Sequence, residues 1–300
     1  MRKKIGGYLR LARPANLPTA AADILAGVCV AGVLVFSNDV QGNESILLYN
    51  VFYLILSSVL LYAGGVVLND VFDHKVDKIE RPERPIPSGL ISLPAASFFG
   101  GLLLVLGVAS SYWVGDLSVL VALLLAMSIL LYDAIAKKHE FFGPLVMGFC
   151  RALNLILGIS ILGELSLAWL AIVPMIYIYA ITLISRGEVH GNNKNHIIWA
   201  GVLYSIVIFT VIGVLVIKTD NIIQTIPFIL LFGFLVFKPL VLAYKSNSPR
   251  NIKKAVIAGV LSLIVLDAAL GTGFSDWMHG LMILALLPIS MFLSKLTAVT

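Results

Sequence analysis

Apolar residues recur in long runs along almost the whole chain, and short polar stretches separate these runs. An α-helix needs roughly 20 apolar residues to cross the hydrocarbon core of a membrane. The pattern therefore predicts an all-α, polytopic membrane bundle of nine core transmembrane helices and a tenth, peripheral helix at the C-terminus. The predicted spans are 16–36, 47–68, 93–114, 117–136, 143–163, 166–186, 196–217, 222–243, 254–271 and 277–295.

The composition agrees with this pattern. Hydrophobic residues make up 59% of the 300 residues, charged residues make up 12%, and the mean hydropathy is +0.99. Soluble domains carry about twice that share of charge. The two cysteines lie inside apolar runs, so no disulfide framework is indicated. We expect a single membrane domain over residues 1–300, with its core at about 8–271.

The basic residues predict the orientation. All but three of the 21 lysine and arginine residues fall in the N-terminal stretch, the C-terminal end and every second loop. Such an asymmetry marks the cytoplasmic side of a membrane protein rather than a surface for nucleic acid. Both termini are then cytoplasmic, which fits ten spans in a cell (inner) membrane. Residues 2–15 are basic and amphipathic, as expected of a segment in the interface.

The second predicted span ends in a cluster of acids and amides, Asn69, Asp70, Asp73 and Asp77. On one helix the three carboxylates fall within roughly 60° of one another. Their mutual repulsion favours a shared cation, and Mg²⁺ takes oxygen ligands that it commonly shares with substrate phosphates. The alternative is a solvated helix end, because basic residues follow at once.

The loop after this cluster contains three prolines between residues 78 and 89. They exclude a helix and stiffen the backbone that presents Arg81 and Arg84. Arginine forks suit phosphate oxygens. Ordinary cytoplasmic charge is the alternative explanation.

Polar side chains also mark the ends of later spans. The fourth span ends with Tyr132, Asp133 and Lys137, of which the intramembrane Asp133 points most to function. In the fifth span, Arg151 and Asn154 lie one turn apart on the same face. A buried arginine costs at least about 3 kcal/mol unless it is paired or faces a wet cavity. A cavity-facing anion site is therefore predicted, with a structural ion pair to Asp133 as the alternative.

The loop after the sixth span carries Arg186 and Glu188 next to glycines. A hydrophilic loop alone would explain them. In the ninth span Asp267 is a further intramembrane carboxylate, with Lys238 or Lys254 as possible ion-pair partners and no catalytic role.

Several of these stretches resemble one known family. They are Leu11–Pro18, the Asn-Asp-x-x-Asp-x-x-x-Asp signature of residues 69–77, the hairpin Arg81–Gly89 and the stretch Tyr132–Lys138. Together they resemble the UbiA superfamily of intramembrane prenyltransferases. Met147–Asn154 and Ser185–Gly191 are similar to its EboC-type branch.

The resemblance implies a prenyl diphosphate held through Mg²⁺ between two acidic motifs, in a cavity open to the cytoplasm and to lipid. Asp70, Asp73, Asp77 and Glu188 would be the catalytic metal ligands. Substrate would be bound by the residues Asn69, Arg84, Tyr132, Asp133, Lys137, Arg151, Asn154 and Arg186. The second acidic motif usually carries several aspartates, whereas here Glu188 stands alone. That metal site is then either weakened or completed by Asp133.

Two hypotheses follow. The chain is a Mg²⁺-dependent enzyme that moves a prenyl group from an isoprenoid diphosphate to a small-molecule or lipid acceptor. Alternatively, it is a non-catalytic protein that binds or transports an isoprenoid, which the thinned second motif favours. The sequence does not identify the acceptor.

Overall fold

The computed structural model describes residues 2–33, 44–188 and 191–298, and these residues form helices, turns and loops without a β-strand. The predicted all-α fold is confirmed. The α-helices are α1 (Arg2–Ala12), α2 (Leu17–Val30), α3 (Glu44–Phe72), α4 (His74–Glu80), α5 (Leu93–Ser111), α6 (Asp116–Ala134), α7 (Phe142–Ile159), α8 (Ile172–Ser185), α9 (Lys194–Lys218), α10 (Ile222–Lys245), α11 (Pro249–Phe274), α12 (Trp277–Leu284) and α13 (Leu286–Ala298). Short 3₁₀ turns are η1 (Pro14–Asn16), η2 (Ala136–Lys138), η3 (Ser160–Leu162) and η4 (Ala168–Ala171).

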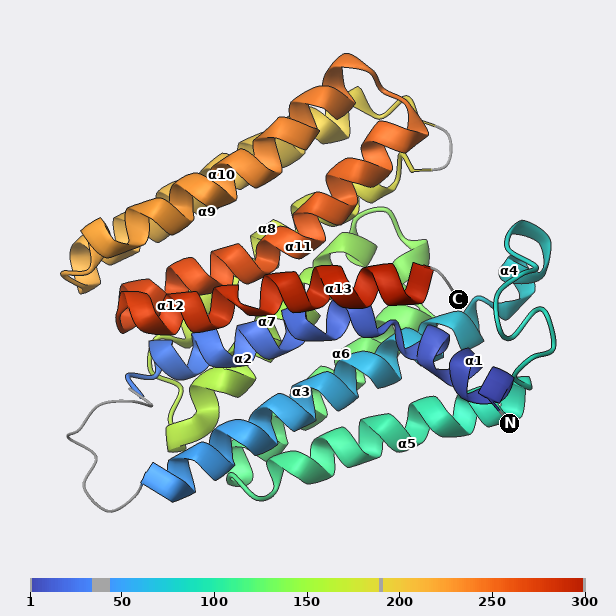
Figure 1. Ribbon diagram of the computed structural model, residues 1–300, viewed down its shortest axis with the longest axis horizontal. Coiled ribbons are helices and arrows are strands. Elements are labelled where there is room, and N and C mark those ends of the chain that lie inside the picture. Colours follow the sequence, from blue (N-terminus) through green and yellow to red (C-terminus); the bar gives the residue numbers. More distant parts are fainter. Residues whose placement is uncertain (1, 34–43, 189–190, 299–300) are drawn as a thin grey trace.

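Within the described residues, nine helical segments are long and apolar enough to cross a membrane. They are Ile46–Phe72, Leu93–Ser111, Asp116–Ala134, Phe142–Leu162, Ala168–Ser185, Lys194–Lys218, Ile222–Lys245, Pro249–Phe274 and Trp277–Lys295. The chain is therefore a multi-pass membrane protein. The described N- and C-terminal ends lie at the same end of the bundle, together with α1 and α4 (Figure 1).

The first predicted span, 16–36, is a shorter helix than expected. Helix α2 ends at Val30, and residues 34–36 lie outside the described residues. Gly32 has a φ of 81°. Its N–H donates to the Cys29 carbonyl at 3.0 Å, and the Val33 N–H donates to Val28 at 3.2 Å. This is the hydrogen-bond pattern of a Schellman cap, which ends a helix at a residue that tolerates positive φ.

Helices α2 and α7 occupy the centre of the bundle. Each of the two helices packs into two large apolar clusters with different faces. One face packs with α8–α11, and the other packs with α3 and α6. Gly27 and Gly158 let the two helices approach closely, since a Cβ on Gly158 would lie 2.5 Å from the Ile24 carbonyl oxygen. Small residues serve this purpose at helix crossings in membranes.

The tenth predicted span is divided into α12 and α13 around Ala285. Pro288 explains the interruption. It has no backbone N–H to donate, and its ring would clash with the carbonyl of Leu284, four residues earlier. Helix α13 lies along α2 and η1 (Figure 1), and the buried Ser290 hydroxyl donates to the Ala15 carbonyl at 2.5 Å. The last helix thus packs onto the segment that leads into α2. It was predicted to be peripheral, but it lies beside the N-terminal segment that carries Arg13.

Candidate active site

The first acidic motif lies where α3 bends into α4. Backbone hydrogen bonds of helical spacing continue through the bend, from Asp73 to Asn69 at 3.0 Å and from Asp77 to Asp73 at 2.9 Å. Asp73 itself lies in the turn between the two helices. The single straight helix that the spacing predicted is therefore two helices with a bend at the motif.

Asp70 and Asp77 are both buried and share one cation. The Arg84 Nη1 atom lies 3.2 Å from Asp70 Oδ1 and 2.7 Å from Asp77 Oδ2. The Arg13 Nη2 atom lies 2.6 Å from the same Asp70 oxygen. Arg13 has a φ of 45°, a left-handed conformation that is uncommon outside glycine and that recurs at functional sites.

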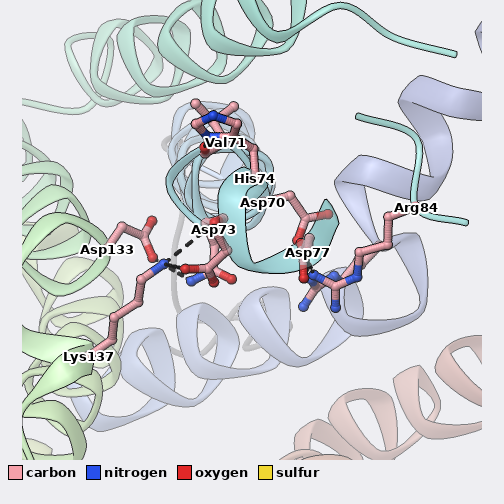
Figure 2. A network of polar contacts seen from close by, with 10 residues as sticks. Asp70, Val71, Asp73, His74, Asp77, Arg84, Asp133 and Lys137 are labelled. Carbon is pink, nitrogen blue, oxygen red and sulfur yellow. Dashed lines mark hydrogen bonds and ion pairs between the residues drawn. The ribbon is translucent and has the colours of Figure 1, made fainter. Parts of the chain in front are cut away.

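Asp73 points the other way, toward the end of α6. Figure 2 shows it facing Lys137 and Asp133, whereas Asp70 and Asp77 face Arg84. The Lys137 Nζ atom lies 2.6 Å from Asp73 Oδ1. The Asn69 side-chain amide donates to Asp133 Oδ1 at 2.7 Å. The structure thus brings the predicted Asn69, Asp133 and Lys137 together, but it divides the three aspartates of the motif into two groups.

A cavity of about 420 Å³ opens beside this cluster. Its mouth is lined by Arg13, Asn69, Tyr132 and Asp133, and its interior is mainly apolar, from Leu125 and Ile129 to Val260 and Leu263. Tyr132 and Asp133 therefore lie where the sequence predicted substrate contacts. The combination of charged mouth and apolar interior suits a ligand with a polar head and a hydrocarbon tail.

Arg151 and Asn154 line the wall of the same cavity, as predicted, but Arg151 is not a free cation. Its Nε atom lies 2.6 Å from Asp23 Oδ2 on α2, and Asn154 donates to the same oxygen at 2.8 Å. The partner is thus Asp23 rather than Asp133. Both partners are buried, so removing only one of them would leave an unpaired buried charge, which typically costs about 3–5 kcal/mol.

Glu188 lies in a second cleft at the rim. The residues that line this rim cleft are Arg13, Arg81, Glu83, Arg84, Glu188, Lys253 and Ser294. Burial raises the pKa of the Glu188 carboxyl, although the cations Lys253 and Arg81 lower it in part. Arg13 and Arg84 line this cleft and also pair with the first motif. The two arginines therefore connect the cleft that contains Glu188 with Asp70 and Asp77.

The structure does not place Arg186 or Asp267 as the sequence predicted. Arg186 donates to the backbone carbonyls of His139 and Glu140, and it is absent from the lining of the cavity and of the rim cleft. No ion pair joins Asp267 to Lys238 or Lys254 in the described part of the chain. Lys238 instead lies over the Phe234 ring, 5.1 Å from its centroid.

Sequence reasoning gave no site role to Arg13 or Asp23. Arg13 was counted among the basic residues of the N-terminal stretch and lay in the resembling stretch Leu11–Pro18 without a role of its own, and its contact with Asp70 depends on the tertiary fold. Asp23 carried a usable signal, since an acid inside a predicted span is by default a candidate functional residue. Its partner Arg151 is 128 positions away, too far for spacing rules to connect them.

The donor set fits Mg²⁺. Among the described residues, no three Asp, Glu, His or Cys side chains are arranged to hold a metal. Mg²⁺, however, is usually bound by one or two carboxylates together with waters and substrate phosphates. Asp70 and Asp77 offer such a pair, and the Arg84 nitrogen between them marks a point where one cation contacts both carboxylates.

The fold and the site together define an intramembrane helical bundle with a charged mouth above an apolar cavity. Residues 25–251 match the model of the UbiA prenyltransferase family. The chain belongs to this family, which confirms the resemblance seen in the sequence.

Several matching relatives carry the name digeranylgeranylglyceryl phosphate synthase. The protein from Methanoregula boonei is 35% identical over 182 residues, which is 60% of this chain and 59% of that protein. The protein from Saccharolobus solfataricus is 38% identical over 127 residues, 42% and 44% of the two chains. The chain thus matches these relatives over about three fifths of their length or less.

Solved structures share the fold. A structure described as digeranylgeranylglyceryl phosphate synthase aligns with a TM-score of 0.67 and 21% identity over 91% of this chain and 99% of that one. A UbiA homolog from Archaeoglobus fulgidus, bound to GPP and Mg²⁺, aligns with a TM-score of 0.66 and 16% identity over 88% and 99%. At these identities the likeness establishes the fold alone.

Proposed function

We propose that the chain transfers a prenyl group from an isoprenoid diphosphate to an acceptor within the membrane, and that it requires Mg²⁺. One observation carries the proposal: paired carboxylates and cations lie directly beside an apolar cavity, whose lining includes their contact partners Arg13, Asn69 and Asp133. This arrangement suits a diphosphate head with a hydrocarbon tail. The Mg²⁺- and GPP-bound relative of the same fold supports it.

The residues at the mouth have distinct roles in this proposal. Asp70, Asp73, Asp77 and Glu188 would hold Mg²⁺, which would supply positive charge to the diphosphate. Arg13, Arg84 and Lys137 release their carboxylate partners and donate to phosphate oxygens, which stabilises the charge that develops there. Asn69, Tyr132 and Asp133 orient the head group at the mouth.

The reaction breaks the bond between the first prenyl carbon and the diphosphate oxygen, and the electron pair leaves with the diphosphate. The acceptor nucleophile then bonds to that carbon and gives up its proton. The apolar wall serves to keep water from capturing the carbocation first. Relatives named digeranylgeranylglyceryl phosphate synthase support an acceptor of the glyceryl phosphate kind and lend no support to the finer assignment to the EboC-type branch.

The mouth faces the cytoplasm in this proposal, with both termini on that side of the cell membrane and the chain acting as one domain. The asymmetry of basic residues supports this orientation. The position of both described ends at one end of the bundle supports it too (Figure 1).

Asp73→Asn and Asp77→Asn test the metal assignment. Each removes one ligand oxygen charge, so each should abolish Mg²⁺-dependent binding of geranyl diphosphate, as measured by calorimetry on purified protein in detergent. Expression should be unchanged, because like-charge repulsion is relieved at the same time. Asp116→Asn is the matched control, since Asp116 is an exposed acid at the opposite end of α6. Undiminished Mg²⁺-dependent affinity in either motif variant would show that the acids form only a solvated helix end.

A further inference from the structure

Four polar side chains interrupt the apolar wall of the cavity below its mouth. They are Thr19, Ser58, Arg151 and Asn154, here called the deep polar patch, and all four are buried. They come from α2, α3 and α7 and are connected to one another, since Ser58 donates to Asn154 Oδ1 at 2.7 Å. An apolar hydrocarbon tail would not need such a patch.

Most of the hydrogen-bonding capacity of the patch is already used. The two amide N–H groups of Asn154 donate to the Ala20 carbonyl at 3.0 Å and to Asp23 at 2.8 Å. Its oxygen accepts from Ser58. Asn154 therefore has no donor left for a ligand.

Arg151 has donors to spare. Its two terminal nitrogens carry four N–H groups. Nη2 donates to the Thr19 carbonyl at 2.5 Å, and Nη1 makes a long contact of 3.4 Å with the Thr19 hydroxyl. Two terminal N–H groups thus have no acceptor in the described part of the chain, although the side chain is only 7% exposed and lines the cavity. A buried donor of this kind requires an acceptor oxygen.

The charge of the surroundings indicates which oxygen. Asp23 lies 2.6 Å from Arg151 and neutralises it. One guanidinium paired with one carboxylate has no net charge. The patch therefore offers no net positive charge to a phosphate, and it suits an uncharged oxygen.

The deep polar patch lies close to the mouth of the cavity. Thr19 is the third residue of α2. Only η1 and the first two residues of α2 separate it from Arg13. Arg13 lines the same cavity and pairs with Asp70. The patch thus lies beneath the place where the diphosphate is proposed to bind.

We propose that the deep polar patch binds an uncharged oxygen of the acceptor, a hydroxyl or an ether, with Arg151 as the donor. The acceptor is thereby held below the head of the prenyl diphosphate and beside its tail. This inference rests on the proposed function, because it takes the donor to occupy the mouth.

The test compares two ligands on the wild type and on Arg151→Lys, in nanodiscs. The lysine keeps a positive charge beside Asp23 but loses the spare N–H groups. Affinity for a radiolabelled glycerol monoether with one long alkyl chain should fall roughly tenfold or more, the usual range for a hydrogen bond to a charged group. Mg²⁺-dependent affinity for geranyl diphosphate should stay unchanged. Lys238→Gln, which alters a basic residue of α10 outside the cavity lining, should change neither affinity.

Three results would overturn the inference. The monoether could bind Arg151→Lys as tightly as wild type. Diphosphate affinity could fall instead, which would place Arg151 in the donor site. The phosphate ester of the same monoether could depend on Arg151 more strongly than the alcohol does, which would make the patch an anion site.

Two design features keep these outcomes separable. If the wild type binds no diphosphate at any Mg²⁺ concentration, the proposed function fails, while monoether binding still tests the patch. If Arg151→Lys does not fold, the double variant Asp23→Asn/Arg151→Gln replaces it, because it leaves no buried charge without a partner. The double variant should show the same selective loss of monoether binding.

Discussion

At the scale of single residues, the candidate site consists of pairs between opposite charges. Asp70 and Asp77 share Arg84, Asp73 pairs with Lys137, and Arg151 pairs with Asp23. Together with the pair of Arg13 and Asp70, four ion pairs lie beside the mouth, and in the proposed function Mg²⁺ takes over the carboxylates and phosphate takes over the cations. The pair inside the cavity is buried on both sides and stays together.

Glu188 is the single acid of its loop, so it alone would have to bind the metal that several aspartates usually share. If it alone carries the second acidic motif, Glu188→Gln should abolish Mg²⁺-dependent binding of geranyl diphosphate, as Asp73→Asn should, because a divalent ion is left with too few ligands. Glu188→Asp keeps the charge but withdraws the oxygens by roughly 1.5 Å. A metal site tolerates only about 0.2 Å, so this variant should also bind poorly.

The measurement is a magnesium titration of diphosphate binding for wild type and the Glu188 variants. Glu83→Gln is a matched control, because Glu83 lines the same rim cleft but lies outside the predicted motif. Wild-type behaviour of Glu188→Gln would mean that the second metal site is missing. The hypothesis of a binding or transport protein would then gain ground.

The sequence predicted the identity of the site residues better than their grouping. The structure brings Asn69, Asp133 and Lys137 together beside the cavity, as a shared site would require, whereas the roles of these residues and of the three aspartates as metal and substrate ligands stay predictions. The bend at Asp73 was not predicted, because hydrogen bonds of helical spacing continue through it and no proline or glycine marks it. The contacts of Arg13 and Asp23 depend on how distant helices pack, which local spacing does not specify.

At the scale of helices, the crossing of α2 and α7 positions the site. Asp23 and Asn154 each lie one turn from a crossing glycine, Gly27 and Gly158 respectively. The close approach of the two backbones therefore holds the ion pair of Asp23 and Arg151 at the cavity wall. Helix α13 packs onto η1 and contributes through the buried hydrogen bond from Ser290 to the Ala15 carbonyl.

Gly27→Ala tests the importance of this crossing. The added Cβ would collide with the Leu155 backbone oxygen, which has no flexible side chain to move aside. Such overpacking should lower the stability by about 1–3 kcal/mol, seen as a lower midpoint of thermal unfolding in detergent.

Gly213→Ala in α9 is the control for this substitution, because a Cβ there meets no atom within 4 Å. Its midpoint should be unchanged or slightly higher, since alanine favours a helix by about 1 kcal/mol over glycine. Equal midpoints for the two variants would show that the α2–α7 approach does not limit stability.

The pattern of apolar runs predicted most helices to within a few residues, because crossing a membrane requires both a length and a composition. The first and last spans departed most. A glycine cap shortened α2, and Pro288 divided the final span into α12 and α13. Both are local backbone effects that a hydropathy pattern does not resolve.

At the scale of the whole molecule, two apolar clusters meet at α2 and α7, and the cavity lies beside this pair of helices with its charged mouth at one end. A bundle of this kind suits the proposed function, in which a hydrocarbon tail lies in the apolar interior and the head group lies at the rim. The same architecture would serve a binding protein, so architecture alone does not decide between transfer and binding.

The central claim is that this site breaks the bond between a prenyl group and its diphosphate. The most direct measurement is the release of diphosphate from geranyl diphosphate by purified protein in nanodiscs, with the phosphate ester of a glycerol monoether as acceptor and with or without Mg²⁺. We predict release and a prenylated ether that both depend on Mg²⁺ and disappear in Asp77→Asn. Tight Mg²⁺-dependent binding of geranyl diphosphate by the wild type, with neither release nor product, would contradict the claim and identify a binding or transport protein.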